Sequence, residues 1–177
     1  MGKRDSSTGY LIVLSLFILL ISGCSGSSDS GLCRSIGGVF THSWPSSDIN
    51  IAETDVDWRD AGTMWEAADL TFNYGIPGQI KYGGSISDSN QCGLAMWEET
   101  NTITQSCTIY LNEELISAGQ CQKRRYVIAH ELGHCLGIEG HIFVSEGGNI
   151  MSSTGGYYID ESTIEKMAEL YKTNECN

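Results

Sequence analysis

Residues 130–141, HELGHCLGIEGH, constrain this chain more than any other stretch. His130 and His134 are four residues apart, so on a helix their imidazoles lie one turn apart on the same face and can reach one metal ion. Glu131 follows the first histidine, close enough to contact a metal-bound water without binding the metal itself. Apolar residues precede the motif, and Gly137 allows the helix to end in left-handed backbone. The pattern therefore predicts a helix over about 122–136 that carries two metal ligands and a general base.

The motif resembles HExxHxxGxxH of the metzincins, zinc endopeptidases in which a turn containing methionine follows. Residues 148–153, GNIMSS, are similar to that turn, and residues 158–171 resemble the C-terminal helix of matrixin-like domains. The resemblance covers about residues 47–172. It implies an α+β fold of the zincin type: a small, mixed, twisted sheet with a long active-site helix and a C-terminal helix. It also implies that Met151 forms an apolar floor beneath the metal, and that 94–98 or 107–112 borders the substrate cleft as an edge strand.

The chain departs from this family at the third histidine. The family pattern places it where this chain has Gly140, and the histidine here is His141, one residue later. The favoured interpretation is a one-residue insertion, with His141 still the third ligand and Gly140 easing the looser turn. A second interpretation gives that role to a carboxylate, either Glu139 or the more distant Glu161 or Glu165. A third is a descendant of the family that binds no metal.

The function implied by the resemblance is zinc-dependent hydrolysis of peptide bonds in a protein or peptide substrate. Three histidines hold one Zn²⁺, a water takes the open position, and Glu131 moves the proton. Two alternatives remain open: a non-catalytic zincin-fold surface lipoprotein acting as a binding module, and a zinc hydrolase of other amide bonds, including cell-wall peptide links. The carboxylates of Asp55 and Asp57 also suggest a Ca²⁺ site.

The N-terminus indicates export. Lys3 and Arg4 precede an apolar run from residue 11 to residue 21, and ISGC at 21–24 resembles a bacterial lipobox. We therefore expect a lipoprotein signal peptide over 1–23, a lipidated Cys24 with a flexible linker over 24–46, and a peptidase domain over 47–177. The expected location is outside the cytoplasm, either periplasmic or on the cell surface, with the lipid anchor as the membrane contact. The formal net charge of −12 argues against nucleic acid as a partner.

Cysteine usage agrees with export. Besides Cys24 the chain has six cysteines and no CxxC pair, so disulfides are expected rather than a cysteine-bound metal. Cys121 and Cys135 lie near opposite ends of the predicted helix, about 21 Å apart at 1.5 Å per residue, and should not pair. Cys92 with Cys107, across a hairpin, is the favoured pairing.

Hydrophobic spacing predicts the remaining elements. Strands are expected over 48–53, 79–82, 93–98 and 102–112. A helix is expected over 56–70, in which Trp58 and Trp65 anchor the core.

Overall fold

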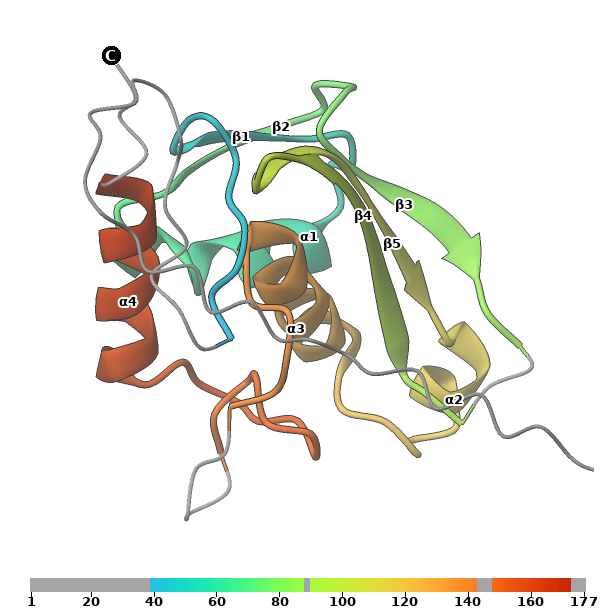
Figure 1. The fold of residues 1–177 in the computed structure, drawn as a ribbon. Helices are drawn as coiled ribbons and strands as arrows, with labels where there is room; N and C mark the ends of the chain where they lie inside the picture. Colours follow the sequence, from blue (N-terminus) through green and yellow to red (C-terminus); the bar gives the residue numbers. More distant parts are fainter. Residues whose placement is uncertain (1–38, 88–89, 143–147, 173–177) are drawn as a thin grey trace, which may run out of the picture.

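The computed structural model describes residues 39–87, 90–142 and 148–172 (Figure 1). In this part of the chain the elements follow one another as β1 (Asp48–Ile51), α1 (Val56–Thr63), a short 3-10 helix (Glu66–Ala68), β2 (Thr71–Tyr74), β3 (Ile80–Ser85), β4 (Gly93–Thr100), β5 (Ile103–Leu111), α2 (Glu113–Ser117), α3 (Arg124–Leu136) and α4 (Glu161–Lys172). The expected α+β class is confirmed.

The five strands form one mixed sheet in the order β2-β1-β3-β5-β4. The neighbouring strands are parallel except for β4, which pairs antiparallel with β5 through a tight hairpin. At the tip of that hairpin Asn101 and Thr102 have φ values of 54° and 67°, which is left-handed backbone. At one end of the strand order β4 is an edge strand, as expected of 94–98, whereas 107–112, apart from its last residue, belongs to the interior strand β5.

Helix α3 packs against β4, β5 and α1, and α4 lies farther from β4 and β5, against the short 3-10 helix (Figure 1). The side chains between these layers are almost all fully buried: Ile49, Ile51, Trp58, Trp65, Ile80, Ile109, Leu111, Ile128, Leu132 and Leu136. Each such side chain contributes about 1.5–3 kcal/mol on leaving water. Trp65 also donates from Nε1 to the carbonyl of Ala129 at 2.9 Å, which ties the segment after α1 to the middle of α3. The prediction that both tryptophans are core anchors is confirmed.

The first helix is shorter than the predicted 56–70. It ends at Thr63, and the chain turns through the 3-10 helix to Asp69, whose φ of 60° is left-handed. This turn frees Thr71–Tyr74 to pair with β1 as β2, a strand that the sequence did not predict. Residues 71–74, TFNY, do alternate polar and aromatic side chains, but four residues directly after a predicted helix give too short a signal for a strand.

The fold also begins earlier than the expected domain boundary at residue 47. Phe40, His42, Ser43 and Trp44 are 1–3% exposed and join the same core. The backbone of this segment bonds to the end of α3, with the amide of Thr41 donating to the carbonyl of Gly137 at 2.9 Å. Residues 39–44 therefore belong to the domain rather than to the linker.

Two disulfides join the described cysteines, Cys92–Cys121 and Cys107–Cys135. The exclusion of Cys121–Cys135 is confirmed, but the pairing Cys92–Cys107 is wrong. In the hairpin Cys107 lies opposite Trp97. Cys92 is five residues from Trp97, or about 17 Å along a strand. Cys107 instead faces α3, where Cys135 is fully buried beside it.

The two disulfides indicate an oxidising compartment. Within the described ranges no helix combines the length and apolarity needed to cross a membrane. The predicted signal peptide, Cys24 and most of the predicted linker lie outside the described residues.

Candidate metal centre

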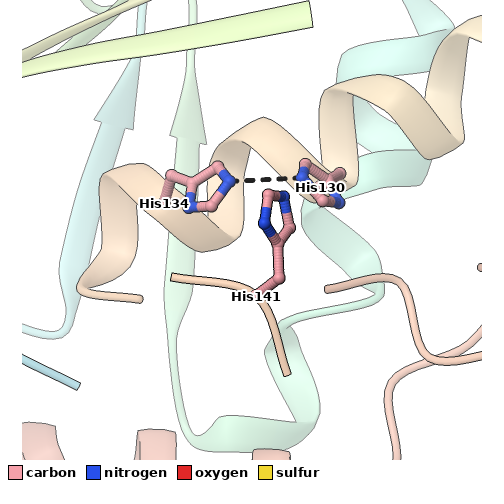
Figure 2. Close-up of side chains that lie close together, drawn as sticks. All are labelled: His130, His134 and His141. Atoms are coloured by element: carbon pink, nitrogen blue, oxygen red, sulfur yellow. Dashed lines mark hydrogen bonds between the residues drawn. The ribbon is translucent and has the colours of Figure 1, made fainter. Parts of the chain in front are cut away.

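Three imidazoles converge where the sequence predicted a metal site. His130 and His134 project from one face of α3, and His141 approaches from the loop after the helix (Figure 2). One ring nitrogen from each lies within 4.8 Å of the others, and among the described residues this is the group that could hold a metal ion. The predicted trio is therefore brought together by the fold.

The hydrogen bonds of the two helical rings prepare them to bind a cation. His130 donates from Nδ1 to the carbonyl of Ile150, and His134 donates from Nδ1 to the carbonyl of Ile138, both at 2.6 Å. In neutral rings the Nε2 atoms are then both acceptors, yet they lie 3.2 Å apart (Figure 2). Two lone pairs at that distance repel unless a cation lies between them. Two ligands at about 2.0–2.1 Å from a tetrahedral metal would have their nitrogens about 3.3 Å apart, so the pair fits a metal such as zinc.

Burial keeps these rings neutral. It lowers the pKa of His130 to about 4, and nearby His134 and His141 act in the same direction, against the bond to Ile150. Burial also lowers the pKa of His134, although its bond to Ile138 opposes the shift. Neutral imidazole is the form that ligates metals. The buried environment therefore favours the metal-binding form of these rings over the protonated imidazolium.

The turn after the helix explains how His141 reaches the site one residue late. Gly137 ends α3 with a φ of 130°, and the amide of Ile138 bonds back to the carbonyl of Gly133 at 3.0 Å. The amide of Glu139 then bonds to the carbonyl of Val39, and the amide of Ile142 to that of Met151. These bonds place the extra residue in an open turn and return His141 to the other two rings.

Of the three interpretations of the third ligand, the geometry favours His141. The metal-binding group of the described residues contains neither Glu139 nor the two carboxylates on α4, Glu161 and Glu165. Glu139 is exposed and lines the cleft into which the three histidines open, which is described below.

Glu131 lies on the sheet side of α3, beneath the edge strand. It is 5% exposed, and its carboxylate accepts a hydrogen bond from the backbone of Ala95. Burial raises its pKa to about 8, although the Ala95 bond opposes this. A cation bound at the neighbouring histidines would favour the charged form again. The carboxyl group is therefore poised to exchange a proton near neutral pH.

Met151 is fully buried under the helix that carries the histidines. A Cβ on Gly133 would lie 2.2 Å from Sδ of Met151 and 2.7 Å from Trp65, so only glycine at this helical position permits the close packing. The apolar floor beneath a bound metal stays a prediction.

The histidines and Glu131 open into a cleft of about 730 Å³. One wall is the start of β4 with the residues before it, and the opposite wall combines the loop into α3 with the segment after Met151. Tyr157 stands at this second wall and is 64% exposed, with its ring edge-on to Tyr126 at 5.2 Å. The disulfide Cys92–Cys121 joins the two walls. The cleft is large enough for several residues of an extended chain.

The suggested calcium site is not supported. Asp55 caps the N-terminus of α1, and Asp55 and Asp57 both face the guanidinium of Arg124, at 3.2 Å and 3.5 Å. The single positive charge of Arg124 partly offsets theirs, and the metal-binding group of the described residues contains neither carboxylate.

Three residues that the sequence analysis did not assign to the site also support it. His42 is 1% exposed, and its Nε2 donates to the carbonyl of His134 at 3.1 Å, closing the end of α3. Gly93 allows β4 to approach Glu131, and Asn149 braces the loop before Met151. Gly93 begins a predicted strand and Asn149 lies within the predicted turn at 148–153. Their roles depend on contacts with distant residues, which spacing along the sequence does not indicate.

No protein-family model matches this sequence, and no curated protein matches it. Among solved structures, the chain is similar to one titled "GM1 bound form of the ECX AB5 holotoxin". The similarity has a TM-score of 0.38 and 11% identity, and covers 72% of this chain and 71% of that one. A similarity this low carries no argument about fold or function.

Proposed function

We propose that this protein is a zinc-dependent endopeptidase with a metzincin-like fold, in which His130, His134 and His141 hold the metal and Glu131 is the general base. The observation that carries the proposal is the convergence of three imidazoles beside a buried carboxylate in a cleft bordered by an edge strand. A binding module has no need of the buried acid.

The donor set favours zinc over harder cations. Three neutral imidazoles suit zinc and related transition metals, whereas calcium and magnesium prefer oxygen ligands. When bound, zinc would supply Lewis acidity that activates water and polarises the scissile carbonyl.

Glu131 would move the proton. Burial raises the pKa of Glu131 to about 8, and a cation at the histidines would lower it again, so the carboxylate could take a proton from the attacking water and return it to the leaving amine. Its backbone partner at Ala95 holds the carboxylate at the cleft while the helix keeps it next to His130 and His134.

An extended peptide is the substrate that fits this cleft. Strand β4 pairs with β5 on one side and ends the sheet on the other, so its outer backbone can receive another strand. Exposed Leu94 lies on β4 and exposed Tyr157 lies on the opposite wall, where both can contact substrate side chains.

We further propose that the domain acts outside the cytoplasm, tethered to a membrane through lipidated Cys24 after removal of residues 1–23. The two disulfides support export. The anchor itself is supported by the lipobox-like sequence alone.

Metal content and hydrolysis test the proposal together. The oxidised protein should bind about one zinc per chain, and His141→Ala should lose it. The wild type should cleave casein or a fluorogenic peptide library in a chelator-sensitive way. Glu131→Gln should keep the zinc but lose hydrolysis by about 10²–10⁴-fold. Zinc binding without hydrolysis of any peptide would point to the binding module instead, and equal zinc in His141→Ala would return the third ligand to a carboxylate.

A further inference from the structure

The orientation of His130 depends on one backbone carbonyl. Its Nδ1 donates to the carbonyl oxygen of Ile150 at 2.6 Å, and Ile150 is fully buried. Such a bond selects both the tautomer of the ring and the direction in which Nε2 points. Whatever holds the peptide group after Ile150 therefore controls how His130 is presented to a metal.

The side chain of Asn149 holds that peptide group. Asn149 is fully buried, and its Oδ1 accepts a hydrogen bond from the amide of Met151 at 2.8 Å. The bond closes a turn around Ile150. On its other side the amide group donates from Nδ2 to Oγ1 of Thr163 at 3.1 Å and to Oδ2 of Asp160. A second bond, from the amide of Ile150 to the carbonyl of Tyr158, also restrains the loop but involves no side chain.

Asp160 in turn is fixed by the start of α4. Its Oδ1 accepts from the amide of Thr163 and from Oγ of Ser162, each at 2.8 Å. One carboxylate oxygen therefore caps the helix, while the other is left for Asn149. Without a docked helix α4, only the bond from the amide of Met151 would still hold the side-chain amide of Asn149.

We propose that Asp160 and Asn149 are positioning residues for His130, acting through the carbonyl of Ile150. They set the tautomer and direction of this one ligand, whereas His134 is held separately by the carbonyl of Ile138. The inference rests on the proposed function only in taking His130 as a metal ligand.

A reciprocal exchange of the two side chains tests the pair. Asn149→Asp places two carboxylates against each other, and Asp160→Asn places two amide groups against each other. The double variant Asn149→Asp/Asp160→Asn restores one donor facing one acceptor and keeps an acceptor for Met151 and for Thr163. Ser162→Ala is the matched control, because it removes a bond to the same Asp160 carboxylate without touching Asn149.

Two measurements follow in the full oxidised chain: zinc affinity by competition with a chromophoric chelator, and ¹⁵N NMR of the histidine rings in the metal-free protein. We expect each single variant to weaken zinc binding about 10–100-fold. We also expect each to shift His130 away from its Nδ1–H tautomer while the His134 signals stay in place. The double variant should return to within about threefold of the wild-type affinity, and Ser162→Ala should stay within about twofold.

Single variants that keep wild-type affinity and tautomer would overturn the inference, and so would a folded double variant no better than the singles. If Asn149→Asp does not fold, Asp160→Asn and the double variant decide by the same criteria. A wild type that binds no zinc would refute the proposed function, while the metal-free NMR comparison would still decide the positioning role.

Discussion

Gly93→Ala tests whether β4 positions Glu131, the proposed general base. Gly93 opens this strand directly above Glu131. A Cβ at this position would lie 2.6 Å from Oε1 of Glu131, 2.8 Å from its Cγ and 2.9 Å from its Cδ. To reach an ordinary contact of 3.4 Å the carboxylate must move by about 0.8 Å. That movement pulls it away from the backbone of Ala95, its hydrogen-bond partner.

The expected loss follows from this displacement. Misplacing a reacting group by about 1 Å reduces the rate by about 100-fold, so kcat/KM of Gly93→Ala should fall about 10–100-fold. This is about 1.4–2.7 kcal/mol of transition-state stabilisation. Zinc affinity should stay within about twofold, because the ring nitrogens and their carbonyl partners are not touched by the new methyl group.

The assay is hydrolysis of a fluorogenic peptide by the zinc-loaded protein, with metal content measured on the same samples. Met96→Ala is the control, because Met96 lies on the same strand but is 56% exposed and does not line the cleft. Wild-type kcat/KM in Gly93→Ala, with zinc bound, would refute the view that β4 holds Glu131 in its working position.

Three further predictions concern the supports of the site. Gly133→Ala should lower the free energy of unfolding by about 1–3 kcal/mol in chemical denaturation, despite the better helix propensity of alanine, because the methyl group would overlap Met151. His42→Ala should cost about 1–3 kcal/mol in the same assay, because it removes one of the two donors to the His134 carbonyl, leaving the amide of Gly137, and empties a buried position. An unchanged denaturation midpoint would show that His42 does not stabilise the end of α3. Burial tends to raise the pKa of Asp160, but bonds from Ser162, Thr163 and Asn149 outweigh it and lower the pKa. Because its pKa is lower in the folded state than in the unfolded state, the ionised Asp160 carboxylate contributes to the free energy of unfolding. This contribution is present above the ordinary pKa of 3.8 and is lost as pH falls through the folded pKa. Acid titration of Asp160→Asn should therefore show a shallower loss of stability than that of the wild type.

The part of the site that could be predicted from the sequence is the part set by local geometry. The spacing of His130, Glu131 and His134 determines their places on α3 once that segment is a helix, because 3.6 residues per turn relate positions one to four residues apart. The same rise per residue excluded the Cys121–Cys135 pairing. The hairpin of β4 and β5 was also expected from its two apolar runs.

Other features depend on where distant segments meet. His141 reaches the other two rings because residues 39–41 bond to the turn after Gly137, a segment that sequence reasoning placed in the linker. The pairing of Cys107 with Cys135 depends on which face of β5 lies on α3. Spacing along the chain carries no information about such approaches, because they follow from the packing of whole layers. Local spacing along the chain thus predicted the places of His130, His134 and Glu131, whereas the packing of distant segments brings in His141, pairs the cysteines and positions the groups that hold His130.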